Sequence, residues 1–244
     1  MLVNSVNGAN SSETWLNAIK FVVENGRRQG SLQREVLNLV SVIQSPLEVS
    51  EEIDQLFRKH IGSKWIFKGA DCIFPVTPNS KRTEHTKWSS NYWGRLTKYR
   101  RKVDQLDFII RRLQSKPHSK QLSCVTFDPE VDIKPDRPYN PFMPCMIALD
   151  VKFRDGRLNL FVMFRSHDFG RKAYGNFIGL GKLLDKLSQE TGYDAGEIVC
   201  YSVSAHIRAK EFGHVAALLK QHNNEFEIPK KVFKETTLEV YSQV

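Results

Sequence analysis

The segment of residues 147–164 constrains the fold of this chain more than any other part of the sequence. Apolar residues occupy every second position on both sides of an Asp-Gly pair: Ile147, Leu149, Val151 and Phe153, then Asp155 and Gly156, then Leu158, Leu160, Val162 and Phe164. A period of two indicates β-strands, and Asp-Gly favours the tight turn of a hairpin. The second strand is apolar on both faces, which predicts a central place in its sheet.

Because the strand pair with the clearest sequence signal is an antiparallel hairpin, the sequence favours an α+β fold over a doubly wound parallel sheet. Helical periodicity predicts helices over residues 13–25, 51–59, 103–113, 176–191 and 208–221. Apolar runs predict further strands over residues 36–43, 122–127, 198–205 and 232–241. We expect a basic turn at residues 26–30 and loops at residues 61–86 and 132–144. No repeat or boundary interrupts this pattern, so one domain over residues 1–244 is expected.

Composition narrows the class of protein. The chain has 244 residues, 41% of them apolar, and a formal net charge of +9, which is typical of a globular protein. No apolar run reaches the roughly 18 residues needed to span a bilayer, and the N-terminus lacks a secretory signal pattern. We therefore expect a soluble, cytoplasmic protein with no membrane partner. The four cysteines lie far apart without a C-x-x-C pair, so neither a disulfide framework nor a metal site is expected.

The positive charge predicts an anionic partner. Cations are dense between residues 81 and 120, where nucleic acid, a nucleotide phosphate or a polyanionic cofactor would be attracted. A solvated helix face would carry the same charges and is the commoner cause of such a run. The sequence shows no RNA-recognition signature, zinc finger or helix-turn-helix pattern, so nucleic acid is the weakest of these interpretations.

Short polar clusters stand at the ends of the predicted strands. Cys145 precedes the hairpin, where it could face a cleft, although a buried structural thiol would look the same. The run from Arg165 to Asp168 directly follows the second hairpin strand, and polar residues at the end of a buried strand are costly unless they bind something. Asn176 begins a predicted helix, where an N-cap is the competing explanation. His206 ends another strand.

Taken in order, these residues resemble the thymidylate synthase family, which includes the pyrimidine nucleotide hydroxymethylases. The resemblance extends from about residue 91 to residue 208. It rests on these elements: Asn91-Tyr92-Trp93-Gly94-Arg95-Leu96, Pro144-Cys145, the hairpin, Arg165-Ser166-x-Asp168, Asn176, Gly192 and Ala205-His206. The resemblance implies a mixed sheet with packed helices and a homodimer formed through the sheet.

The chemistry that the resemblance implies is a one-carbon transfer from methylenetetrahydrofolate to carbon five of a pyrimidine nucleoside monophosphate. The Cys145 thiolate would add to carbon six of the base, which makes carbon five nucleophilic. Arg165 would favour the thiolate and also bind the phosphate. Asp168 would hold the pterin ring of the folate. These three residues form the implied catalytic set.

The resemblance also implies a nucleotide-binding set. Ser166 would contact the nucleotide, and His206 would bind the sugar hydroxyl. Asn176 would read the base and favours uracil, because an amide can both donate and accept hydrogen bonds. Phosphate-binding cations in this family come partly from the other subunit, and the matching positions here are Lys120 and Gln121. Arg28, with Arg27 beside it, is the candidate for a further phosphate ligand.

Several positions depart from the family pattern. Met146 replaces a histidine, Phe164 a glutamine and Arg208 a tyrosine, which leaves ribose and deoxyribose open. The usual catalytic glutamate has no convincing counterpart among Glu51, Glu52 and Glu84. Two interpretations therefore stay open: an enzyme that methylates or hydroxymethylates a uracil nucleotide, and a non-catalytic or regulatory nucleotide-binding protein on the same fold.

Overall fold

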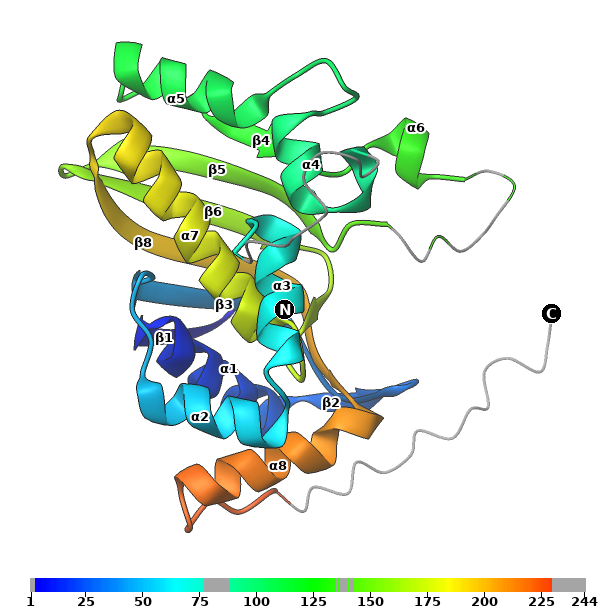
Figure 1. The fold of residues 1–244 in the computed structure, drawn as a ribbon. Coiled ribbons are helices and arrows are strands. Elements are labelled where there is room, and N and C mark those ends of the chain that lie inside the picture. The colour runs from blue at the N-terminus through cyan, green and yellow to red at the C-terminus, as the bar shows by residue number, and fades with distance from the viewer. Residues whose placement is uncertain (1–2, 77–87, 135, 137–139, 141–142, 230–244) are drawn as a thin grey trace.

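The computed structural model describes residues 3–76, 88–134, 136, 140 and 143–229 (Figure 1). The predicted strand over residues 232–241 and the candidate Glu84 lie outside these residues. The strands form one mixed, eight-stranded sheet in the order β1-β3-β8-β6-β5-β4, with β2 beside β3 and β7 beside β8. Their bounds are β1 (Asn4–Asn10), β2 (Arg27–Gln29), β3 (Leu32–Ser45), β4 (Ser123–Val125), β5 (Met146–Arg154), β6 (Arg157–Phe164), β7 (His167–Asp168) and β8 (Asp194–Arg208).

The predicted hairpin is confirmed as β5 and β6. Its turn residues Asp155 and Gly156 have φ values of 52° and 79°, which are the two left-handed conformations that this type of tight turn requires. Strand β6 lies between β5 and β8, and it pairs antiparallel with the first and parallel with the second. The predicted central place of this strand is therefore also confirmed.

The five predicted helices are confirmed as α1, α2, α5, α7 and α8. The helices run over α1 (Ser11–Asn25), α2 (Glu51–His60), α3 (Lys64–Ile73), α4 (Tyr92–Thr97), α5 (Gln105–Ser115), α6 (Pro129–Asp132), α7 (Ala173–Thr191) and α8 (Ala209–His222). Gly192 ends α7 in the left-handed conformation, with φ 76°. Each helix that the structure describes is too short or too polar to span a bilayer.

Two local predictions were wrong. The segment predicted as a basic turn forms strand β2, because Arg27 pairs with Glu35 and Gln29 with Leu32, and only Gly30 takes the left-handed turn conformation. The segment predicted as a loop over residues 61–86 contains helix α3. The α3 helix escaped prediction because its buried stripe includes Gly69 and Ala70, which carry little apolar signal.

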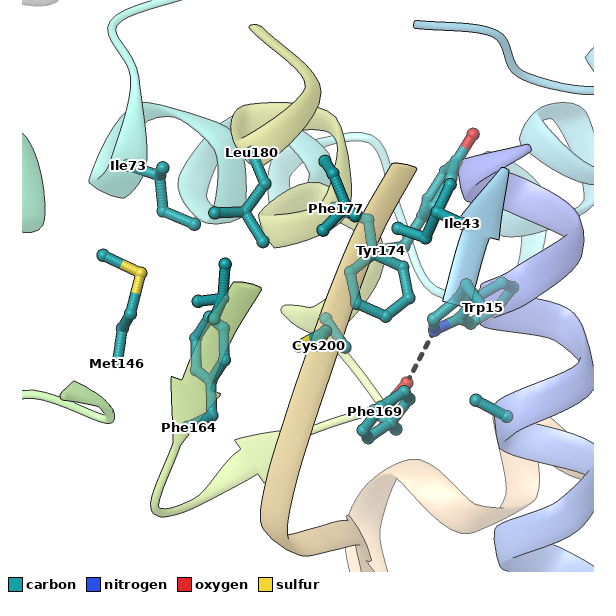
Figure 2. Close-up of a cluster of buried hydrophobic side chains, with 14 of the residues drawn as sticks. Trp15, Ile43, Ile73, Met146, Phe164, Phe169, Tyr174, Phe177, Leu180 and Cys200 are labelled. Carbon is teal, nitrogen blue, oxygen red and sulfur yellow. Dashed lines mark hydrogen bonds between the residues drawn. The ribbon is translucent and has the colours of Figure 1, made fainter. Parts of the chain in front are cut away.

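The core lies between the sheet and the helices that cover it. Helix α7 crosses in front of β6 and β8 (Figure 1). Large side chains from α1, α7 and the sheet fill the space beneath it, among them Trp15, Phe164, Tyr174 and Phe177 (Figure 2). The Trp15 Nε1–H donates to the Phe169 carbonyl at 3.0 Å, which satisfies the one polar group of this fully buried indole.

Helices α3 and α7 approach so closely that their backbones touch. A Cβ on Gly69 would lie 2.8 Å from the Gly175 Cα, and a Cβ on Gly175 would lie 2.4 Å from the Ile66 carbonyl oxygen. Glycine is therefore required on both sides of this crossing. One consequence is that the Gly69 carbonyl comes within reach of Asn176, the next residue along α7.

A buried ion pair anchors the segment that carries α4. The Arg95 guanidinium binds both Asp132 carboxylate oxygens at 2.7 Å and the Thr126 carbonyl at 2.6 Å, and both charged side chains are almost fully buried. This bidentate geometry satisfies charges that would otherwise be costly to remove from water.

We expect Arg95→Met to lower the free energy of unfolding by about 3 kcal/mol or more, because it leaves the Asp132 carboxylate buried without its cation. Urea denaturation followed by circular dichroism measures this change. The control is Arg111→Met, since Arg111 pairs with Asp107 in the same helix with both side chains largely exposed. Its expected loss is below about 0.5 kcal/mol. Equal losses in the two variants would contradict the assignment of the Arg95 pair as structural.

Candidate functional site

Five of the sequence-predicted site residues gather where the hairpin begins and ends. Strand β5 starts beside the end of β6, and the Arg165 N–H donates to the Cys145 carbonyl at 2.8 Å. The chain then rejoins the sheet as β7, where Asp168 pairs with His206 on β8. Ser166 lies half-buried between β6 and β7. The structure thus places Cys145, Arg165, Ser166, Asp168 and His206 along one end of the sheet.

The backbone around Cys145 is fixed from α4. The Tyr92 hydroxyl oxygen accepts hydrogen bonds from the backbone N–H groups of Cys145 and Met146, both at 3.1 Å. Burial is the main cause that raises the pKa of Tyr92, and the neighbouring Cys145 adds to the shift. The phenol of Tyr92 therefore stays protonated. The Cys145 side chain itself is only partly buried. A partly exposed thiol on a fixed backbone is the arrangement that a nucleophile needs.

The Arg165 side chain folds back towards the loop that precedes Cys145. Its Nε donates to the Pro144 carbonyl at 2.9 Å, and its Nη2 donates to the Met143 carbonyl at 3.0 Å. Both the backbone and the guanidinium of Arg165 therefore bind the segment that carries the cysteine. The guanidinium of Arg165 is thus held against the two residues that precede Cys145.

Asp168 is 8% exposed and is held by cations. Its Oδ2 accepts two hydrogen bonds from Arg171, at 2.9 and 3.0 Å, and Arg208 lies 3.7 Å away. Arg171 also approaches Glu211, at 3.3 Å. The other carboxylate oxygen of Asp168, Oδ1, is buried and finds no hydrogen-bond partner among the described residues. Asp168 therefore keeps one acceptor available for a ligand that donates.

His206 is buried with one ring nitrogen unused. Its Nδ1 lies 3.4 Å from the Ser204 carbonyl, whereas its Nε2 has no hydrogen-bond partner in the part of the chain that the structure describes. Glu35 pairs with His206 across β3 and β8, and its carboxylate accepts from the Ser204 hydroxyl at 2.5 Å. Burial lowers the pKa of His206, although Asp168 and Glu35 oppose that shift.

Asn176 does not cap a helix. Helix α7 begins at Ala173, and Asn176 lies within it, 6% exposed. The Asn176 Nδ2 donates to the Gly69 carbonyl at 3.0 Å. The N-cap explanation is therefore wrong, because the helix starts earlier than its polar residue suggested.

His167 occupies the position between Ser166 and Asp168 and is almost fully buried. Its ring stacks on Phe164 with centroids 4.0 Å apart and an interplanar angle of 4°. Burial lowers the pKa of His167 to about 3, and His206 adds to that shift. The imidazole is therefore neutral at physiological pH.

Two of the candidate phosphate ligands, Arg28 and Lys120, lie at the surface, apart from Cys145. Arg28 is exposed on β2, on the far side of β3 from His206. Lys120 is exposed just before β4, and the Leu122 carbonyl accepts from Val151. Because Val151 lies about 20 Å along β5 from Cys145 at the usual rise of a strand, the structure does not bring Lys120 to the Cys145 of its own chain.

The family's catalytic carboxylate still has no clear counterpart among the described residues. Glu51 and Glu52 are exposed in the first turn of α2. Met146 and Phe164, which stand where the family pattern has a histidine and a glutamine, are buried in the hydrophobic core. Gln121 accepts a hydrogen bond from Arg112 at 2.8 Å.

Sequence reasoning missed two polar residues of this region. Glu35 reaches His206 only through the β3–β8 register, for which the sequence carries no local signal. Tyr92 was noted only as part of a motif, and its contact with the Cys145 backbone depends on how α4 packs.

We expect acid to destabilise the protein through His167. The unfolded chain binds the proton near pH 6.5, whereas the folded state resists it down to about pH 3. The contribution of His167 to the free energy of unfolding is therefore fully present above about pH 6.5 and is lost as the pH decreases. Between pH 7 and pH 5 we expect a loss of about 2 kcal/mol from this group.

Urea denaturation of wild type and His167→Phe at several pH values isolates this contribution, because the buried His206 shifts in the same direction and is present in both. The stability difference between the two proteins should change by that amount over this pH range. Parallel stability curves would contradict the expectation.

Comparisons with known proteins identify one family. The family model for thymidylate synthase matches residues 47–242. A protein from Methanosarcina acetivorans named "Putative thymidylate synthase" is 31% identical over 225 residues, which cover 89% of this chain and 95% of the relative. A protein of the same name from Methanothermobacter thermautotrophicus is 32% identical over 219 residues, covering 86% of this chain and 95% of that relative.

The family model matches most of the chain, and the relatives have this identity over most of their length, which together show the family. Members of this family use a folate cofactor in one-carbon transfer. The chain belongs to the thymidylate synthase family.

Proposed function

We propose that the protein transfers a one-carbon unit from methylenetetrahydrofolate to carbon five of a uracil nucleoside monophosphate, with Cys145 as the nucleophile. The observation that carries this proposal is the joining of Cys145 and Arg165 at adjacent strand ends, by the Arg165 N–H and by the guanidinium contacts to residues 143 and 144. A partly exposed thiol whose loop is held by a guanidinium is placed to act as a nucleophile.

The residues around Cys145 fit the parts of a nucleotide. Arg165 and Ser166 offer a guanidinium and a hydroxyl to a phosphate. The unpartnered Nε2 of His206 can bind a sugar hydroxyl. Asn176 presents an amide, and an amide can pair with the N3–H and O4 groups of uracil.

A folate also fits the residues present. The buried, unpartnered Oδ1 of Asp168 can accept from a ring N–H of the pterin, while Arg171 holds Oδ2 and fixes the carboxylate. When bound, methylenetetrahydrofolate supplies the carbon and, for methylation, the hydride. A hydride that reaches the new carbon would give a methylated product, whereas water would give a hydroxymethylated one. Analysis of the product distinguishes the two.

We expect wild-type protein with methylenetetrahydrofolate to release tritium from carbon five of labelled dUMP or UMP, and Cys145→Ala to fall below about a thousandth of that rate. The reason is that carbon five loses its hydrogen only after carbon six is attacked.

The control is Cys124→Ala, which removes a buried thiol of β4 away from the site and should keep the activity. Labelled dCMP tests the preference for uracil. Nucleotide binding without tritium release would instead support the non-catalytic alternative. Two features favour that alternative: the neutral Gln121 at a position where the family has a phosphate-binding cation, and the exposure of Glu51 and Glu52, the candidates for the catalytic glutamate.

We further propose that the site is completed by a second copy of the chain, through the sheet face that faces away from α7. Phe161 and Met163 on β6 are 41% and 37% exposed. They line a depression together with Ala148, Val199 and Tyr201 from neighbouring strands. An apolar face on a central strand is unusual at a free surface, and a twofold dimer would bury it. Such packing would also let Lys120 serve the partner's site.

We expect Lys120→Ala and Cys145→Ala to complement each other when they are coexpressed. Each mixed dimer would hold one intact site, so a statistical mixture should recover about a quarter of the wild-type activity. Tritium release measures it, against each variant alone.

Phe161→Arg introduced into both chains is the control, because a charge on this face should yield monomers by light scattering and abolish the recovery. No gain over the Lys120→Ala protein alone would show that Lys120 does not act across a dimer.

A further inference from the structure

The Arg171 guanidinium joins two carboxylates that are almost fully buried. Its Nε lies 3.0 Å from Asp168 Oδ2 and 3.3 Å from Glu211 Oε1, and its Nη2 donates to Asp168 Oδ2 at 2.9 Å. The Trp65 ring covers the guanidinium, with the ring centroid 4.7 Å from Cζ. Asp168 and Glu211 are each 8% exposed. One cation therefore brings the carboxylates of β7 and of the first turn of α8 together.

Each of these carboxylates keeps one oxygen that the cations do not use. Arg171 and Lys210 both approach Glu211 at Oε1, just as Arg171 binds Asp168 at Oδ2. The other two oxygens, Asp168 Oδ1 and Glu211 Oε2, are buried and find no hydrogen-bond partner among the described residues. A carboxylate oxygen can only accept, and a buried acceptor is costly when it stays unpaired. The pair therefore points to a ligand that donates two hydrogen bonds.

Gly170 leaves a space that both carboxylates border. A Cβ at this position would lie 3.5 Å from Asp168 Oδ1 and 3.1 Å from the Glu211 Cβ. Gly170 does not take a positive φ, so its backbone conformation alone does not call for glycine. The missing side chain is what keeps the space beside Asp168 Oδ1 open.

The pterin ring of a folate presents two such donors, because its N3–H and its 2-amino group are neighbours on one edge. Asp168 alone cannot accept from both. Its Oδ2 already accepts two hydrogen bonds from Arg171 and lies 3.7 Å from Arg208. Oδ1 is left for the N3–H, and the 2-amino group needs a second acceptor. Glu211 Oε2 is buried, unpaired in the described part of the chain, and belongs to a carboxylate that the same cation holds.

We propose that Glu211 is a specificity-determining residue of the folate site, accepting from the 2-amino group of the pterin while Asp168 accepts from N3–H. This inference rests on the proposed function, in which Asp168 meets the folate. Arg171 is the positioning residue, because it binds one oxygen of each carboxylate and leaves the other for the ligand. A folate without the 2-amino group would leave Glu211 Oε2 buried and unpaired, so the site rejects it.

The test compares the binding of tetrahydrofolate and of its 2-desamino analogue by anaerobic calorimetry in the presence of dUMP. We expect wild type to bind tetrahydrofolate about tenfold or more tightly than the analogue, which is the effect of one hydrogen bond to a charged group. Glu211→Gln keeps the shape of the side chain. With its Oε1 held by Arg171, it turns an amide donor towards the amino group. This variant should lose about that factor with tetrahydrofolate and keep its affinity for the analogue.

Two further variants test the place of the ligand. Glu225→Gln makes the same replacement at an exposed carboxylate after α8 and should leave both affinities unchanged. Gly170→Ala should weaken both ligands, because its Cβ enters the space beside Asp168 Oδ1. Wild-type affinities in Gly170→Ala would contradict the placement of the pterin in this space.

The outcomes separate this proposal from the proposed function. A wild type that binds neither folate would overturn the folate site, and this inference with it. A wild type that binds tetrahydrofolate and its analogue equally would overturn the role of Glu211 alone and leave Asp168 as the pterin ligand. Equal weakening of both ligands in Glu211→Gln would likewise show that Glu211 acts only on the structure of the site.

Discussion

The parallel pairing of β6 and β7 with the single long strand β8 is the constraint on which the candidate site depends. Strand β6 pairs with β8 as far as Phe164 and Ser202, and β7 resumes the pairing at His167 and Ala205. Between the two, Arg165 and Ser166 leave the sheet. At this interruption the Arg165 N–H binds the Cys145 carbonyl, while β8 holds both ends of the segment in register.

The same pairing explains why so many polar side chains can be buried at this end of the sheet. Backbone groups are satisfied by the sheet, so side chains are free to bind one another or a ligand. Arg171 neutralises Asp168, Ser204 bonds to Glu35, and the imidazole of His167 stays neutral. Among the described residues, Asp168 Oδ1 and His206 Nε2 stay without a hydrogen-bond partner, and the proposed function assigns both atoms to ligands. A site arranged before its ligand arrives avoids the cost of ordering these groups during the reaction.

The parts of the fold that the sequence predicted are those with strong local signals. The hairpin followed from strict alternation around Asp155 and Gly156, and helix α7 from its apolar stripe and Gly192. Strand β2 was missed because three polar residues carry no strand signal, and it forms only because β3 offers an edge. Helix α3 was missed because glycine, which weakens a helix in isolation, is required where α3 meets α7.

The sequence by itself determined the elements and the order in which Cys145, Arg165, Asp168, Asn176 and His206 occur, because strand ends and polar clusters are local properties. Only the tertiary structure decided which atoms meet. The register of β8 sets Glu35 beside His206, and the helix crossing turns the Asn176 amide. The distance along β5 removes Lys120 from the Cys145 of its own chain. These contacts join residues that are distant in the chain, so they depend on how the sheet and helices pack.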